Sequence, residues 1–141
     1  MDPKPVPVPD PGSEGFWAAA SSHVLAIQRC TDCGWYAYPP NVVCRNCLAP
    51  EPSFRYEPVS GRGRVTTWTV VHQAFLPGFA ADVPYVVAEV ELAEQDGLRM
   101  LARLTGVRSG DLTIGMPVEV AFDDVASGTA VPRFVPAAGR A

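Results

Sequence analysis

Residues 28–48 read QRCTDCGWYAYPPNVVCRNCL and contain all four cysteines of the chain. The cysteines follow the pattern C-x2-C-x10-C-x2-C. Each C-x2-C pair has the spacing of a knuckle, a tight turn that directs two thiolates at one metal ion. Gly34, directly after the second cysteine, permits the left-handed backbone that such a turn requires. The stretch therefore predicts one metal site made of four thiolates, Cys30, Cys33, Cys44 and Cys47.

Four thiolates complete the tetrahedral shell of zinc and leave no position for water or substrate, so we expect a structural metal. Two disulfides would require an oxidising compartment, and the sequence shows no export signal. A thioredoxin-like redox pair would require a βαβ context. Iron accepts the same four ligands, and the ligand set leaves that alternative open. With strands over 24–28 and 35–38 and a Pro39-Pro40 break, the sequence predicts a rubredoxin-type zinc ribbon, which with the preceding helix occupies residues 13–54.

After the ribbon, apolar and polar residues alternate over short segments. The first segment, 64–72, is dense in β-branched and aromatic residues, and its alternation places Val65 and Trp68 on opposite faces. We expect four further strands, the last of them edge-like because it contains Pro132, over 85–92, 98–104, 118–122 and 131–135. A connector with a partial helical turn covers 107–115. The pattern predicts a mainly β fold in which residues 55–141 form a five-stranded OB-fold barrel.

Every second residue from Pro3 to Pro11 is proline. Because proline fixes φ and lacks an amide donor, residues 1–12 are expected to be an extended, disordered leader. A short helix follows, with Ser13 as its N-cap and an end near Ser22 and His23. Four large residues, in this helix and in a Pro-Gly loop, fall outside the barrel pattern. We expect them to mark a protein interface: Phe16, Trp17, Phe75 and Phe79.

Charge and motifs exclude several functions. The net charge of −4 and the pI of about 5.0 disfavour a nucleic-acid binder that neutralises phosphates. No apolar run approaches the roughly 20 residues that span a bilayer, and without an export signal we expect a cytoplasmic protein. The histidines are His23 and His72, no cysteine remains outside the metal site, and neither a G-x-S-x-G elbow nor a P-loop is present. We therefore expect no catalytic residue and no activity from this chain alone.

The sequence resembles the acyl-CoA-associated OB-fold proteins that carry an N-terminal rubredoxin-like zinc ribbon, a family long known as a domain of unknown function. The resemblance spans residues 15–136. Besides the two knuckles, it depends on four motifs: Val59-Ser60-Gly61-Arg62-Gly63, Thr69-Val70-Val71-His72, Val83-Pro84-Tyr85-Val86-Val87-Ala88 and Ile114-Gly115-Met116-Pro117-Val118.

The resemblance implies a non-catalytic subunit that binds a thiolase-like or lipid-transfer-protein-type enzyme and helps to hold its coenzyme A thioester. The enzyme would be an aldolase or acyltransferase acting on acyl-CoA, including steps of steroid side-chain degradation. Thiolase-like enzymes usually dimerise, so the complex is expected to be a heterotetramer or larger. The acyl group is not specified by this chain.

Ten arginines stand against one lysine. Arg62 and Arg64 flank Gly63 at the start of the first barrel strand, and guanidinium groups bind phosphates in a bidentate fashion. Trp35 and Trp68 are candidates for stacking on adenine. His72 is a candidate donor to a thioester carbonyl or a pantetheine amide. Each of these residues also has an ordinary reading as a surface or strand-packing side chain. Basic and aromatic residues on an OB barrel equally suit single-stranded nucleic acid, which is the alternative function.

Overall fold

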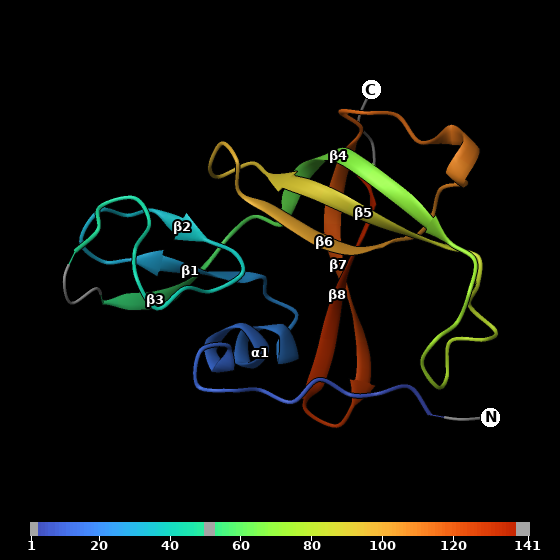
Figure 1. Cartoon of the computed structure of the whole chain (residues 1–141), viewed down its shortest axis with the longest axis horizontal. Coiled ribbons are helices and arrows are strands. Elements are labelled where there is room, and N and C mark those ends of the chain that lie inside the picture. Colours follow the sequence, from blue (N-terminus) through green and yellow to red (C-terminus); the bar gives the residue numbers. More distant parts are fainter. Residues whose placement is uncertain (1–2, 50–52, 138–141) are drawn as a thin grey trace.

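Two β-sheets and one helix make up the part of the chain that the computed structural model describes, residues 3–49 and 53–137 (Figure 1). The smaller sheet is the zinc ribbon. It has the order β2-β1-β3, with antiparallel neighbours, and its strands are β1 (Ala26–Cys30), β2 (Tyr36–Ala37) and β3 (Phe54–Pro58). The β1–β2 hairpin is the one that the sequence predicts. No helix within the described ranges is long and apolar enough to cross a membrane.

Strand β3 extends the ribbon beyond residue 54, where the sequence places the boundary with the barrel. All five residues of β3 pair with β1, from Phe54 opposite Cys30 to Pro58 opposite Ala26. The strand was not predicted, although Phe54 and Tyr56 alternate with charged residues. The partner that makes this short segment a strand lies about 28 residues earlier in the chain, and local periodicity carries no information about such a partner.

The larger sheet closes into a five-stranded barrel, which confirms the predicted OB-fold. The strand order is β4-β5-β6-β8-β7, and β7 also pairs with β4. Neighbouring strands are antiparallel except for β6 and β8. The bounds are β4 (Arg62–Val71), β5 (Tyr85–Leu92), β6 (Arg99–Leu104), β7 (Pro117–Ala126) and β8 (Thr129–Pro136), with a 3₁₀ turn, η1 (Ser109–Asp111), in the predicted connector.

The prediction that the last strand lies at an edge is wrong, because β8 lies between β6 and β7. Its pairing with β6 covers only Arg103 opposite Arg133 and Leu104 opposite Phe134. Pro132, which has no amide to donate, therefore lies just outside that short parallel ladder. A proline in a strand normally indicates an edge, where no amide donor is needed. In β8 the ladder with β6 does not include Pro132, so that ladder needs no donor from it.

A β-bulge changes the phase of β4. The pairing of β4 with β5 shifts between Val65 and Thr67, so Thr66 is the extra residue. Its hydroxyl donates to the side chain of Glu89 at 2.8 Å. As a result Val65 is fully buried and Trp68 packs against the same core, although strict alternation places them on opposite faces. The faces that strict alternation predicts for this strand are therefore wrong, because the bulge shifts them by one residue.

The N-terminal helix, α1 (Glu14–Ser21), begins after Ser13 and ends before Ser22, as predicted. The Ser13 hydroxyl does not cap the helix; it accepts a hydrogen bond from the Asp10 amide, while the Asp10 carboxylate accepts one from the Ser13 amide. In the first turn of the helix a Cβ at Gly15 would overlap the Tyr56 ring, so glycine permits close contact between α1 and β3.

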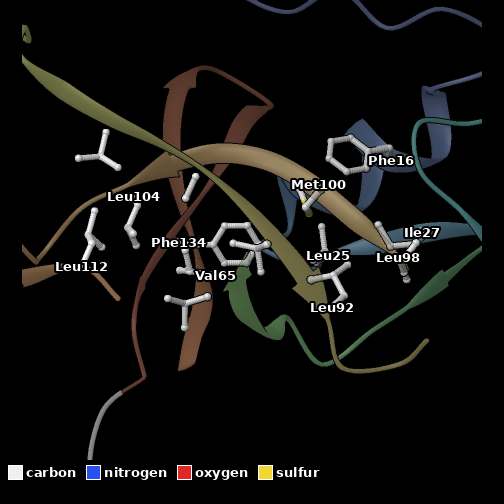
Figure 2. Packing of buried hydrophobic residues seen from close by; sticks show 14 residues of the cluster. Phe16, Leu25, Ile27, Val65, Leu92, Leu98, Met100, Leu104, Leu112 and Phe134 are labelled. Atoms are coloured by element: carbon white, nitrogen blue, oxygen red, sulfur yellow. The ribbon is translucent and has the colours of Figure 1, made fainter. Parts of the chain in front are cut away.

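One hydrophobic core joins the ribbon, the helix and the barrel. Phe16 of α1 and Ile27 of β1 belong to the same buried cluster as Leu92, Met100 and Phe134 of the barrel strands, and Figure 2 shows these side chains gathered in one group. Phe16 is therefore a core residue, which corrects the expectation that it marks an interface. The ribbon and the barrel have separate sheets but share one hydrophobic core.

Candidate metal centre and ligand surfaces

The four cysteines come together at one end of the ribbon sheet. Cys30 is the last residue of β1, Cys33 lies in the turn that follows, and Cys44 and Cys47 lie in the second turn. Their sulfur atoms all lie within 4.8 Å of one another; Cys33 and Cys44 are 3.5 Å apart and Cys30 and Cys47 are 3.9 Å apart. A tetrahedron with Zn–S bonds of about 2.3 Å has edges of about 3.8 Å. The donor set and its spacing fit a zinc ion.

The two knuckles have equivalent backbones. In each, the residue after the second cysteine has a left-handed conformation, with φ of 80° at Gly34 and 55° at Leu48. Each of these residues donates its amide to the carbonyl of the first cysteine, Gly34 to Cys30 at 2.9 Å and Leu48 to Cys44 at 3.0 Å. The sequence signals the first knuckle through its glycine. Leucine gives no such signal in the second, where the metal-binding turn itself imposes the conformation.

The thiols influence one another strongly. A hydrogen bond from the Asn46 side chain, followed by one from the Trp35 backbone, lowers the pKa of Cys33 to about 6. The Ala49 backbone lowers the pKa of Cys47, but desolvation and the three neighbouring thiols outweigh it and raise that pKa to about 12. Cys33 and Cys47 thus differ widely in acidity although they belong to the same cluster. A divalent metal supplies the charge that lets all four ionise.

Two polar side chains of β1 hold the ribbon loops, and neither role was predicted. Gln28 is buried and donates to the Asn41 carbonyl at 3.0 Å while accepting from the Asn41 amide at 2.8 Å. Arg29 donates to the Gly34 carbonyl at 2.9 Å and to Glu57 at 2.8 Å. Gln28 thus holds the segment that leads to the second knuckle, and Arg29 joins the first knuckle to β3.

The five residues proposed from sequence as coenzyme A contacts do not converge on one site. Arg62 and Arg64 line a shallow pocket of about 400 Å³ at the start of β4. Trp68 packs against the core, Trp35 lies on the ribbon hairpin with 39% of its surface exposed, and His72 is exposed beyond the end of β4. Eight residues of strand separate Arg64 from His72, or about 26 Å. Only the two arginines form a local cluster.

His23, the other histidine named in the sequence analysis, and two aspartates of β7 are paired within the fold. His23 lies 2.8 Å from Asp124 and stacks on Phe122 with ring centroids 5.4 Å apart. Asp123 accepts a hydrogen bond from Arg133 at 2.9 Å. These pairs join the end of α1 to β7, and β7 to β8, and their role is structural.

An apolar groove of about 430 Å³ was not predicted. It lies between α1, the leader, the loop that joins β4 to β5, and strands β6 to β8, and it includes Trp17 and Phe79 in its walls. These two residues, expected at an interface, are half-buried there. No sequence motif marks the groove, because its walls come from segments more than 100 residues apart.

Of the four residues expected to mark an interface, Phe75 alone is largely exposed. It has 82% of its surface accessible, and its neighbour Leu76 has 58%. Both lie in the β4–β5 loop, residues 72–84, which protrudes from the barrel at the lower right of Figure 1. Such a pair of large, exposed apolar side chains in a protruding loop has the character of an interface anchor.

The ribbon and the barrel define this chain as a zinc-ribbon OB-fold protein with a closed, four-cysteine metal site. Residues 17–53 match the family described as "ChsH2, rubredoxin-like zinc ribbon domain", and residues 56–123 match "ChsH2, C-terminal OB-fold domain". The chain belongs to this family, whose members also carry the name DUF35, and the resemblance stated from the sequence is confirmed.

A solved structure described as "Ltp2-ChsH2(DUF35) aldolase" contains a chain that is 32% identical to this one, with a TM-score of 0.79 over 92% of this chain and 98% of that one. A 3-oxo-4,17-pregnadiene-20-carboxyl-CoA hydratase alpha subunit from Mycobacterium tuberculosis is 39% identical over 77% of this chain. A DUF35 domain-containing scaffold protein from Methanocaldococcus jannaschii is 36% identical over 67%. The chain spans 33% of the hydratase subunit and 64% of the scaffold protein.

Proposed function

We propose that this chain is a non-catalytic subunit that docks on a thiolase-like, lipid-transfer-protein-type aldolase and contributes to binding its steroid-type acyl-CoA. The observation that best supports this proposal is the structural match to a chain of the Ltp2–ChsH2(DUF35) aldolase, which covers 98% of that chain. The chain's own chemistry agrees with a supporting role. Its four thiols form the closed metal site, and His23 is held by Asp124. Carbon–carbon cleavage is thus left to the partner.

Docking is assigned to the β4–β5 loop. Phe75 and Leu76 are consecutive and exposed in this loop, and burial of such anchors in a partner's pocket typically contributes about 2 kcal/mol or more each. Because thiolase-like enzymes usually dimerise, the assembly is proposed to hold two copies of each chain or more. Four thiols committed to a metal also suit a reducing compartment such as the cytoplasm.

The test is co-expression with a thiolase-like aldolase, followed by size-exclusion chromatography and titration. We expect Phe75→Ala combined with Leu76→Ala to weaken the complex by several hundred-fold, since about 2 kcal/mol from each anchor sums to about 4 kcal/mol. The matched control is Ile114→Ala, because Ile114 is 67% exposed but lies in the β6–β7 connector. Equal affinity of the double variant and the control would remove the loop from the interface. A wild-type chain that elutes alone at every concentration would refute the subunit proposal and return attention to nucleic acid.

The contribution to acyl-CoA binding is assigned to Arg62 and Arg64, which share one pocket. In the assembled complex, Arg62→Ala with Arg64→Ala should raise the KM for acyl-CoA several-fold without weakening the complex, since phosphate contacts act on the ligand. Arg108→Ala is the control, because Arg108 is an exposed arginine on the η1 side of the barrel. Separate Trp35→Ala, Trp68→Ala and His72→Ala variants test the other candidates. An unchanged KM in the double arginine variant would contradict the assignment.

A further inference from the structure

The described part of the leader is fastened to the rest of the chain at both ends. At one end the Tyr56 hydroxyl donates to the Gly12 carbonyl at 2.5 Å. At the other end the Lys4 ammonium lies 2.6 Å from the Asp82 carboxylate and 5.3 Å from the centre of the Phe79 ring. Figure 1 shows the leader crossing from α1 to the β4–β5 loop. The sequence predicts a disordered leader; in the structure this segment makes contacts at Lys4 and at Gly12.

The leader lies directly on the loop. A Cβ at Gly78 would be 2.7 Å from the backbone nitrogen of Lys4 and 2.9 Å from the Lys4 Cα. Asp82 is shared, because the Arg103 guanidinium also donates to it at 2.8 Å. Arg103 stacks 4.6 Å from the Tyr85 ring, and Tyr85 contacts Phe79 with centroids 6.2 Å apart. The contacts thus run from the leader through the loop to β6 and β5 and return to the leader.

Proline explains how a segment without regular structure holds this position. Eight residues separate Lys4 from Gly12, which is about 25 Å in a polyproline conformation. Proline at every second position restricts the free segment to extended forms, so fastening it costs less conformational entropy than fastening a flexible chain.

We propose that residues 3–9 are an intramolecular strap that pre-organises the β4–β5 loop, and with it Phe75 and Leu76, for docking on the thiolase-like partner. The docking half of this inference rests on the proposed function; the strap half does not. The strap does not itself fill the partner's pocket. It holds the loop in the docking conformation and so reduces the ordering that binding would otherwise require.

The strap is tested on the full chain without a partner, by hydrogen exchange of the amides in residues 74–83. Lys4→Met removes the charge but keeps the length of the side chain. It should speed exchange by about two- to tenfold, the range expected for one half-exposed ion pair with a cation–π contact. Deletion of residues 2–9 should do the same or more. Arg108→Met, which breaks the exposed Arg108–Asp111 pair at η1, is the control and should leave these amides unchanged.

A direct reading of the contact is available because Lys4 is the only lysine. After reductive methylation with ¹³C-formaldehyde, the Lys4 methyl resonance should lie upfield of free dimethyl-lysine, owing to the Phe79 ring, and should return to the free position in Phe79→Leu. A wild-type resonance at the free position, or unchanged loop exchange in both Lys4→Met and the deletion, would overturn the strap.

The docking half is tested by affinity for the partner. Lys4→Met should weaken the complex by about the factor by which it speeds loop exchange. Pro5→Gly with Pro7→Gly, which keeps the charge and loosens the strap, should weaken it in the same direction. If the loop loosens while affinity stays at the wild-type value, the docking role is wrong. If the wild type binds no thiolase-like enzyme, the proposed function fails, while the exchange experiment still decides the strap.

Discussion

Leu48 occupies a backbone conformation that leucine rarely adopts. Its φ is 55°, and its amide donates a hydrogen bond to the Cys44 carbonyl, as the Gly34 amide does to the Cys30 carbonyl in the first knuckle. A left-handed L-residue carries a cost of about 1–2 kcal/mol. The side chain is largely exposed, so little packing offsets that cost. The conformation is therefore maintained by the geometry of the turn around the cysteines.

This equivalence predicts different responses to substitution at the two positions. Gly34→Ala should lower the free energy of unfolding by about 1 kcal/mol, because it places a Cβ at φ 80°. Leu48→Gly should leave it within about 0.5 kcal/mol, since relief of strain offsets the greater flexibility of the unfolded chain. Denaturant unfolding of the metal-loaded proteins measures both. A larger loss in Leu48→Gly than in Gly34→Ala would contradict the equivalence of the knuckles.

Glu57 predicts a pH dependence for the ribbon. The hydrogen bond from Arg29 lowers the pKa of Glu57 below its ordinary value of 4.5. A carboxyl group whose pKa is lower in the folded state stabilises that state above its unfolded pKa, and the contribution is lost as the pH falls through the folded pKa. The difference in unfolding free energy between wild type and Glu57→Gln should thus be constant near neutrality and shrink below about pH 4.5. Metal loss in acid affects both proteins and cancels in the difference. A difference that grows in acid would contradict the Arg29 contact.

At the level of elements, the sequence predicts best where the residues of a strand alternate regularly between a buried and a less buried face. The predicted span of β5 is the observed one, and Val86, Ala88, Val90 and Leu92 are all buried. The phase of β4 was missed because one extra residue in a bulge leaves no mark on composition. β3 and the place of β8 were missed because they depend on pairing with distant strands.

The same limit applies to the sites. Cysteine spacing alone predicted the metal ligands, because four thiolates that close one site must come together in space. The arginine, tryptophan and histidine candidates were chosen by residue type, and residue type does not say where a side chain lies in space. Arg64 and His72, for example, lie about 26 Å apart along the direction of β4. The groove and the Lys4 strap are contacts between remote segments, and only the folded chain reveals them.

Gly63 of β4 lies very close to β5. A Cβ there would lie 2.5 Å from the Glu91 carbonyl oxygen and 2.6 Å from the Val90 side chain. Gly63→Ala should therefore push β4 away from β5 and cost about 1–3 kcal/mol of stability. Gly110→Ala is the matched control, because open space surrounds that position and its backbone is not left-handed. Thermal unfolding of the two variants checks the prediction, and equal melting temperatures would contradict it.

On the scale of the whole molecule, the ribbon and the barrel are packed as one body. Ile27 of the ribbon is fully buried in the cluster that contains Leu92 and Met100 of the barrel. Loss of order in the ribbon must therefore expose apolar surface of the barrel. The metal stabilises more than the loops that bind it.

We expect one zinc ion per chain in freshly purified protein, and none in Cys44→Ser. Because a structural metal contributes folding free energy locally, Cys44→Ser should raise hydrogen exchange most in β1 to β3, next in α1, and least in β5 and β6. Metal analysis and exchange measured by mass spectrometry test this order. Two disulfides in the fresh protein, or iron in place of zinc, would contradict the assignment of the ion.

β3 follows the metal-binding turns in the chain and pairs with β1 along its whole length, on the edge of β1 that does not face β2. A fragment that stops at residue 53, where the family's zinc-ribbon match ends, would leave that edge with unpaired backbone groups. Uncovered edges recruit strands from other molecules. Such a fragment is expected to self-associate and scatter light, even with its metal bound. A fragment extended to Pro58 keeps this edge paired, so it should self-associate less than the fragment that stops at residue 53.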